Sequence, residues 1–272
     1  MTLARGLGLL RLLAEERGPG LGIADVCERS RLHRVTAHRL LANLMREGFV
    51  EQDEQRRYHL GVEAWRMGVS ASRVFDLVKI ADPSLDTIEQ EMQDTTFLLK
   101  RSGNEAICVA RREGTYLLKF LVMDVGVGYP IGVGAGTLAI LAYLDPEDAD
   151  RALAETETKL HRFPSISIPL IRQMAEETRT RGFALSRGLI VPSAYSAAVP
   201  IFDAAGRPIG SFACAAAPDR LSGERLDFVV QTMRREAEIV TARLSGRPQH
   251  ADQAAPPKAM KRPRTSVHTR AH

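Results

Sequence analysis

The first fifty residues of the chain repeat helical apolar spacing three times, with turn-forming residues between the repeats. The first repeat has apolar residues at intervals of four, three and four, namely Leu3, Leu7, Leu10 and Ala14. Gly18-Pro19-Gly20 ends this helix, a second short helix is expected over 23–30, and a third is expected over 33–47. Three helices in so short a stretch predict a compact trihelical unit.

A small hairpin is expected directly after the third helix. Phe49-Val50 and Tyr58-His59-Leu60-Gly61 suit two short strands, and the stretch 51–57 between them is polar and rich in turn formers. The order helix, helix, helix, hairpin therefore predicts one N-terminal domain over residues 1–61.

The third expected helix has a basic outward face. Its apolar side consists of Ala37, Leu40, Leu41 and Leu44. Val35, His38 and Arg39 therefore point outward, and Arg34 lies on the flank. The stretch 29–39 contains four arginines, two histidines and no acid. Such a helix suits the DNA major groove, where arginine can bond guanine edges or phosphate and a small apolar side chain can touch a thymine methyl group.

The hairpin adds Arg56 and Arg57 near a tip that could reach the sugar-phosphate backbone or the minor groove. Helices and hairpin together predict a winged helix-turn-helix domain whose partner is double-stranded promoter DNA. The candidate DNA contacts are Arg31, Arg34, Val35, Thr36, His38, Arg39 and Arg57. The alternative is a surface-charged three-helix bundle without a DNA-binding role.

The pattern after residue 61 changes from helices to strands. Residues 62–80 predict a helical connector, and Asp82-Pro83 should interrupt the helical pattern so that the proline starts a new helix. Strands are expected over 95–101, 105–112, 116–122, 182–187, 194–202 and 208–216, and helices over 136–144, 146–155, 168–181 and 222–244. Segregated strands and helices predict an α+β domain over 81–245.

The net charge of +4 is concentrated at the C-terminal end. Residues 246–272 contain six basic residues and one acid, a net of +5, so the rest of the chain sums to −1. This stretch of proline, alanine and basic residues predicts a disordered basic tail. Its Lys261-Arg-Pro-Arg264 segment could add nonspecific DNA affinity, the alternative being a solvated and dispensable tail.

Several classes of protein are excluded by what the sequence lacks. No apolar run approaches the roughly 18 to 20 residues of a membrane helix, and no signal peptide is present, which predicts a cytoplasmic protein. Cys27, Cys108 and Cys214 are far apart with no CxxC pair, so neither a disulfide framework nor a metal site is expected. With no GxSxG, HExxH, Walker or well-placed Rossmann motif, neither an enzyme nor a cofactor is expected.

The N-terminal string Thr36-Ala-His-Arg-Leu-Leu41, followed by Arg57-Tyr58 and Leu60-Gly61, resembles the DNA-binding domain of IclR-type bacterial transcriptional regulators. The body is similar to the ligand-sensing domain of the same family at Arg181-Gly-Phe-Ala184, Ala198-Val-Pro-Ile-Phe-Asp203, Gly206, Pro218 and Arg220-Leu221. The resemblance covers nearly everything except the tail. It implies a GAF-like domain that binds a small organic effector, often a carboxylate.

The residues themselves also indicate a ligand pocket. Pro130-Ile-Gly-Val-Gly-Ala-Gly136 precedes an expected helix, where bare backbone amides can meet an anion. Small polar residues follow on the next strands among apolar neighbours. The candidate effector-binding residues are Gly134, Ala135, Gly136, Ser193, Ser196 and Cys214. The glycine run could instead be only a tight turn, and Arg187 could clamp a carboxylate or simply face solvent.

Four positions depart from the commoner family pattern. Gly132 and Gly134 stand where the family has histidine and threonine, Ser196 stands where it usually has cysteine, and the acid often found near Ser186 is missing. These changes predict a larger or less polar pocket, suited to a bulkier acid such as an aromatic one.

Taken together, the sequence predicts a DNA-binding transcriptional regulator that a small organic acid modulates. It is expected to form a homodimer or a dimer of dimers through its first helix and the connector, with one recognition helix on each half of a palindromic site. The alternative is a constitutive dimeric DNA-binding regulator with no effector.

Overall fold

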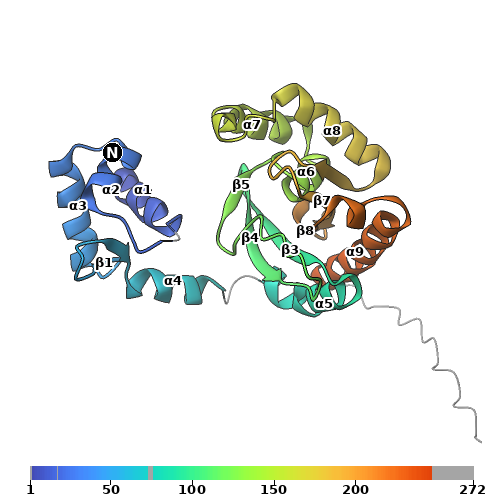
Figure 1. Cartoon of the computed structure of the whole chain (residues 1–272), viewed down its shortest axis with the longest axis horizontal. Coiled ribbons are helices and arrows are strands. Elements are labelled where there is room, and N and C mark those ends of the chain that lie inside the picture. The colour runs from blue at the N-terminus through green and yellow to red at the C-terminus, as the bar shows by residue number, and fades with distance from the viewer. Residues whose placement is uncertain (1, 17, 73–75, 247–272) are drawn as a thin grey trace, which may run out of the picture.

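The computed structural model describes residues 2–16, 18–72 and 76–246 (Figure 1). Its N-terminal elements are α1 (Thr2–Ala14), α2 (Ile23–Ser30), α3 (Arg34–Arg46), β1 (Val50–Gln52), β2 (Tyr58–Leu60) and α4 (Val62–Ser72). The body contains α5 (Asp76–Met92), β3 (Thr95–Ser102), β4 (Glu105–Arg112), β5 (Gly128–Pro130), α6 (Ala135–Leu141), α7 (Pro146–Glu157), η1 (Leu160–Arg162), α8 (Ile168–Arg181), β6 (Ala184–Arg187), β7 (Tyr195–Phe202), β8 (Pro208–Ala216), η2 (Pro218–Leu221) and α9 (Gly223–Leu244). The predicted tail, apart from Gly246, lies outside the described residues.

The N-terminal head, residues 2–60, is a three-helix unit with a small antiparallel hairpin. The hairpin pairs Val50 with Leu60, and an isolated bridge between Leu21 and Tyr58 ties it to the turn before α2. The head has a core of its own, formed by Leu9, Leu13, Leu21, Val26, Ala37, Leu40, Leu41, Val50 and Tyr58. The predicted winged helix-turn-helix arrangement is therefore present.

The residues that α1 buries are not those of the apolar stripe noted in its sequence. Its buried residues are Gly6, Leu9 and Leu13, whereas Leu3 is 76% exposed and Leu7 is 44% exposed. Both sets have helical spacing, so periodicity alone does not say which set meets the core. Leu10 packs against the head core, whereas Leu3 and Leu7 form an apolar surface outside it.

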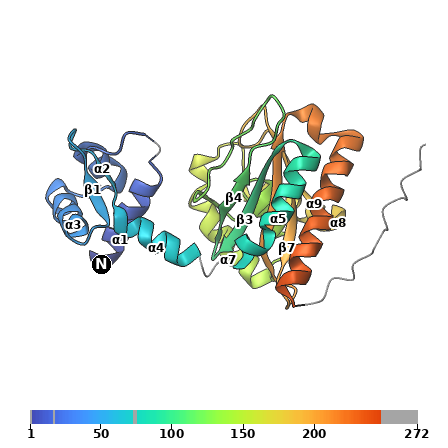
Figure 2. The same cartoon turned by 90° about the horizontal axis from the view of Figure 1, so that it is seen from below.

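The body is built on one six-stranded antiparallel sheet with strand order β5-β4-β3-β8-β7-β6. Helices α6, α7 and α8 cover one face of the sheet (Figure 1), and α5 and α9 cover the other, which faces the viewer in Figure 2. Each face has its own apolar core, since Leu99 packs with the α6 side and its neighbour Leu98 packs with the α5 side. The body is the predicted α+β domain, and its curled sheet is consistent with a GAF-like fold.

The strand predicted over 116–122 does not form. This stretch is a loop, and the edge of β4 pairs with β5, where Glu105 lies opposite Pro130. The loop begins at Gly114, where a Cβ atom would lie 2.0 Å from the carbonyl oxygen of Gln93. The chain is thus held against the turn between α5 and β3, away from the edge of the sheet. The aromatic and aliphatic residues of this stretch are typical of a strand, which is why one was predicted. A strand also needs a free sheet edge to pair with, and composition carries no information about that.

The break predicted at Pro83 is also absent, because α5 continues through this residue from Asp76 to Met92. Proline removes one backbone donor inside a helix. The apolar face that includes Ala81, Leu85 and Ile88 is fully buried against the sheet and α9. Burial of this face stabilises the helix enough to offset the cost of the proline. The proline was visible in the sequence, but the tertiary packing that offsets it was not.

Candidate functional site

The outward face of α3 is basic and exposed, as predicted. Arg34, Val35, His38 and Arg39 are all exposed, and Val35 is 82% exposed. The neighbouring Leu40 and Leu41 are buried in the head core, which holds the helix in place. Within residues 2–16, 18–72 and 76–246, none of the four outward side chains forms a hydrogen bond or an ion pair. Their polar groups are thus available to a partner.

A hollow of about 290 Å³ joins this face to the hairpin. Arg34 and His38 line it from α3, and Gln52 and Arg56 line it from the hairpin. Gln52 is a residue that the sequence analysis missed, because one polar residue in a short strand carries no distinguishing signal. The hollow makes the helix face and the wing one continuous surface.

The two arginines of the wing have different environments. The Nη1 atom of Arg57 donates to the carbonyl oxygen of Gly20 at 3.1 Å, so this guanidinium fastens the wing to the turn before α2. Arg56 is exposed, with a left-handed backbone at φ 60°, and its carbonyl oxygen accepts from Gln52 at 3.1 Å. Arg56 is therefore the wing arginine with the more accessible charge, although Arg57 was the predicted contact.

The base of the wing is held by a polar pair. His59 Nε2 lies 2.8 Å from Asp53 Oδ2, and the backbone N–H of Arg57 donates to Asp53 Oδ1 at 2.7 Å. These two hydrogen bonds, that of His59 first, lower the pKa of Asp53 from its ordinary value. The carboxylate stays ionised near neutral pH and keeps the turn of the wing closed.

Two other predicted residues flank the reading face of α3. Arg31 is exposed at the C-terminal end of α2, where its left-handed backbone (φ 55°) turns the chain toward α3. Thr36 is half-buried within α3. The structure thus places six of the seven predicted DNA contacts on or beside the exposed turn and helix, with Arg57 tied to the head itself.

The second candidate site is a small cavity of about 50 Å³ on the α6 side of the sheet. Gly134, Ala135 and Gly136 line it at the start of α6, and Ser196 and Cys214 line it from β7 and β8. Five of the six predicted effector-binding residues therefore meet around one cavity.

Two other sequence-based expectations about this pocket do not fit the structure, and one open alternative is decided. Ser193 is exposed in the turn before β7 and does not line the cavity. Arg187 is exposed on β6, as the alternative of a solvent-facing residue predicted, and it does not line the cavity. Gly132 was expected to enlarge the pocket, but a Cβ there would lie 2.6 Å from Cγ2 of Ile171, so its space is already filled by α8. Ser193 was misplaced because spacing along the chain does not show where β7 begins.

The glycine run is both a turn and a pocket wall. Gly134 precedes α6 with φ 84° and ψ 163°, a conformation that side-chain-bearing residues rarely adopt. At Gly136 a Cβ would lie 2.8 Å from Leu99 Cδ2, so glycine lets α6 approach the sheet closely. The glycine run is therefore a tight turn that also lines the cavity, and ligand contact at Gly134 to Gly136 stays a prediction.

Most of the cavity wall is apolar and comes from segments that the sequence did not single out. These additional lining residues include Phe97, Leu99, Val122, Met123, Tyr129 and Ile190. They come from β3, β5 and two loops, so only long-range strand pairing brings them together. None of the described residues that line the cavity carries a charged side chain.

The thiols of the body are neutral. Burial raises the pKa of Cys214 well above its ordinary value and raises the pKa of Cys108 to about 11. Cys214 is fully buried, and its side chain packs in the apolar core on the α5 side of the sheet, so its thiol faces away from the cavity that the residue borders. The site can hold a mostly apolar molecule with few polar groups, and its residues present no activated nucleophile.

The described residues contain neither a membrane-spanning helix nor a metal cluster. Over 2–16, 18–72 and 76–246, no helix combines the length and the apolar character that a membrane crossing requires. Over the same ranges, no group of three or more His, Cys, Asp or Glu side chains is placed to hold a metal ion.

Comparison with known proteins places both parts of the chain. Residues 2–54 match the IclR helix-turn-helix domain, and residues 69–242 match the bacterial transcriptional regulator IclR C-terminal domain. The glycerol operon regulatory protein of Streptomyces coelicolor is 30% identical over 237 residues, which cover 82% of this chain and 87% of that protein.

Solved structures agree with this assignment. An IclR transcriptional regulator from Alicyclobacillus acidocaldarius has a TM-score of 0.75 at 26% identity, covering 90% of this chain and 98% of that one. An IclR homolog from Microbacterium hydrocarbonoxydans, solved in complex with 4-hydroxybenzoate, has the same fold, with a TM-score of 0.73 at 21% identity over 90% of this chain and 100% of that one. The two matched domains describe transcriptional regulators and not enzymes. The chain belongs to the IclR family of bacterial transcriptional regulators.

Proposed function

We propose that this protein binds promoter DNA through the outward face of α3 and the wing, and that a small organic molecule in the α6 cavity modulates this binding. The observation that carries the proposal is the presence, in one chain, of an unpaired basic helix face and a mostly apolar cavity at a distance from it in sequence. Because its partner is promoter DNA, we place its site of action in the bacterial cytoplasm.

The effector that we propose is a small organic acid with an aromatic ring. Phe97, Leu99 and Tyr129 supply apolar and aromatic surface for a ring. The hydroxyl of Ser196 and backbone N–H groups at 134–136 would meet the carboxylate, since no charged side chain among the described lining residues can do so. These features support an acid whose apolar part is larger than its polar part.

A constitutive regulator without an effector is the second candidate, and the size of the cavity favours it. About 50 Å³ is well below the roughly 150 Å³ of an engineered cavity that holds benzene. An aromatic ligand therefore needs the cavity wall to move, whereas a protein without an effector needs no such change.

One experiment separates these two candidates. The purified full-length protein selects its site from a randomised duplex library, and its affinity for that site is then measured with and without 4-hydroxybenzoate and other aromatic and aliphatic carboxylic acids. A sensor is expected to change its DNA affinity by about 5- to 150-fold with at least one of these acids. The constitutive regulator would be supported if the protein binds its site tightly and specifically, no acid alters this binding, and no acid raises the melting temperature.

We also propose that the head self-associates through α1 and α4. Leu3 and Leu7 of α1 lie outside the head core, and the α4 residues Val62, Trp65 and Met67 are 54%, 68% and 59% exposed. Large apolar side chains left exposed on two helices are typical of protein interfaces. A homodimer, or a dimer of dimers, would place two α3 helices on the two halves of a palindromic site.

Replacing Leu3 and Leu7 together with glutamate is expected to dissociate the heads and to lower operator affinity, because two buried charges would oppose the interface. Sedimentation velocity measures the association, and circular dichroism checks that the head stays folded. Leu117→Glu is the matched control, since Leu117 is 90% exposed in the body. Dissociation by the control instead of the α1 variant would place the interface in the body.

A further inference from the structure

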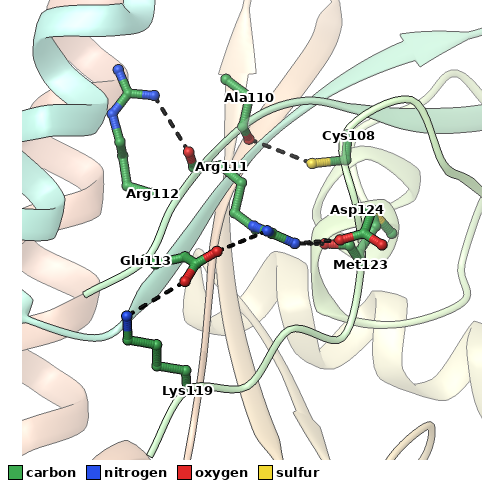
Figure 3. Close-up of polar contacts among 8 residues, drawn as sticks. All are labelled: Cys108, Ala110, Arg111, Arg112, Glu113, Lys119, Met123 and Asp124. Carbon is green, nitrogen blue, oxygen red and sulfur yellow. Dashed lines mark hydrogen bonds and ion pairs between the residues drawn. The ribbon is translucent and has the colours of Figure 1, made fainter. Parts of the chain in front are cut away.

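Two adjacent arginines at the end of β4 reach toward opposite faces of the sheet. Arg111 extends toward the loop of residues 113–127, which we call the pocket loop, and Arg112 extends toward α5 (Figure 3). The pocket loop contributes Val122 and Met123 to the wall of the α6 cavity. The end of β4 is therefore in contact with the cavity wall on one side and with α5 on the other.

On the loop side, the single guanidinium of Arg111 holds both ends of the pocket loop. Its Nη2 donates to Glu113 Oε1 at 2.9 Å, and its Nη1 donates to the carbonyl oxygen of Met123 at 3.3 Å and to the carboxylate of Asp124. Lys119 adds a weaker link to Glu113 at 3.4 Å (Figure 3). Any outward movement of Met123 would therefore pull directly on Arg111.

On the helix side, Arg112 donates hydrogen bonds to two carboxylates that lie one turn apart on α5. Its Nε donates to Asp86 Oδ1 at 2.6 Å, and its Nη2 donates to Asp82 Oδ1 at 2.7 Å. The side chain of Arg112 is 30% exposed, so water screens these bonds only in part. Helix α5 is the first element of the body and follows α4 along the chain.

A β-bulge decides which arginine faces which side. Leu98 pairs with Ala110, but Leu99 pairs with Cys108, so Val109 is one extra residue in β4. Cys108 packs in the core on the α6 side, whereas Ala110 packs in the core on the α5 side. An extra residue exchanges the faces of every residue after it. The bulge thereby turns Arg111 toward the pocket loop and Arg112 toward α5.

The pocket loop is fastened at its start but has few contacts in its middle. The backbone N–H of Tyr116 donates to the carbonyl oxygen of Gln93 at 2.9 Å, and the Arg220 guanidinium stacks 3.8 Å from the Tyr116 ring centroid. Leu117, Leu118 and Leu121 follow, at 90%, 55% and 45% exposed. The exposed leucines make 117–121 the least fixed part of the loop. Beyond them, Val122 accepts a hydrogen bond from the hydroxyl of Tyr129 at 2.9 Å and Met123 is buried, so Arg111 contacts the end of the loop that is packed into the cavity wall.

We propose that Arg111 and Arg112 are positioning residues that transmit occupancy of the α6 cavity to α5, and from there toward the DNA-binding head. This inference rests on the proposed function. A molecule larger than the present cavity displaces Val122 and Met123, which shifts Arg111. Because Arg111 and Arg112 share a peptide unit, the same shift changes how Arg112 holds α5.

Amide hydrogen exchange of the full-length protein tests the coupling without a ligand. Arg111→Gln and, from the loop side, Asp124→Asn are expected to speed exchange in 113–127 and, by about fivefold or more, in α5, which neither side chain contacts. A merely local role would leave α5 unchanged. Slow exchange of α5 in both variants, with a loosened loop, would overturn the proposal.

Two further variants complete this experiment. The double variant Arg111→Gln with Arg112→Gln is expected to match Arg112→Gln alone in α5 exchange, because residues that act in series are not additive. Arg101→Gln is the control, since Arg101 forms a comparable ion pair with Asp148 of α7 at 2.9 Å. Additive effects, or an equal loosening of α5 by the control, would contradict transmission through Arg111 and Arg112.

A ligand measurement separates this inference from the proposed function. With 4-hydroxybenzoate as the probe, Arg112→Gln is expected to keep its affinity for the probe within about threefold while its DNA affinity no longer responds. If the wild-type protein itself shows no DNA response to the probe, the proposed function loses support, and the exchange experiment still decides the coupling.

Discussion

Arg39→Ala is expected to remove sequence-specific DNA binding while leaving the fold intact. The side chain of Arg39 is exposed at the middle of α3, and the buried residues Ala37, Leu40 and Leu41 hold the helix in the head. An arginine bonded to a base edge is worth about 1 to 3 kcal/mol, so the loss is about 5- to 150-fold for each half-site and larger for a dimer. Fluorescence anisotropy on the selected site measures this loss, and thermal unfolding checks that alanine is tolerated.

Arg46→Ala provides the matched control. Arg46 lies in the last turn of α3, its side chain is 74% exposed, and it pairs with Glu47 at 3.3 Å. Removing this charge should weaken specific and random duplexes equally, because it alters general attraction to phosphate. Unchanged operator affinity in Arg39→Ala would contradict the placement of α3 in the major groove. If the variant instead lost as much affinity for random DNA as for the operator, Arg39 would be a phosphate contact and not a base contact.

Ser196→Leu is expected to abolish the response to an effector while preserving basal DNA binding. Ser196 lies on β7, opposite Ser186 and Ala215 in neighbouring strands, and lines a cavity of only about 50 Å³. A leucine side chain would occupy that space, at a cost of about 1 to 3 kcal/mol if the surroundings must shift. Calorimetry with 4-hydroxybenzoate measures whether the variant still binds the effector. The DNA titration with and without this acid measures basal DNA binding and its response.

Ser193→Leu is the control for this variant, because Ser193 is exposed and lies outside the cavity. It should respond to the effector as the wild type does. A normal response in Ser196→Leu would show that the ligand binds elsewhere. The first alternative would then be the larger hollow of about 410 Å³ between α9 and β7, which Tyr143, Phe202 and Arg234 line.

The head was predictable in most respects because its elements are local. The spacing of Ala37, Leu40 and Leu41 correctly assigned the buried side of α3, and the acid-free stretch around it correctly assigned the exposed side. The buried side of α1 was not predictable in the same way. Two helical stripes compete there, and only packing against α2, α3 and the hairpin selects the one with Leu9 and Leu13.

The body shows the same division. Most of its strands and helices follow from alternation and turn residues, yet the loop over 116–122 and the unbroken helix through Pro83 do not. Both depend on neighbours distant in sequence, namely the Gln93 carbonyl for the loop and the sheet for the helix. Composition describes what a segment could form, whereas the available partners decide what it does form.

The sequence by itself determined the order of the elements in the head, the basic face of α3 and the glycine turn that begins α6, since each depends on residues within a few positions of one another. The tertiary structure alone decided the apolar wall of the cavity, the tethering of Arg57 to Gly20 and the directions of Arg111 and Arg112. The physical reason is that strand pairing, with one extra residue at Val109, joins segments far apart in the chain and sets the face on which each side chain lies.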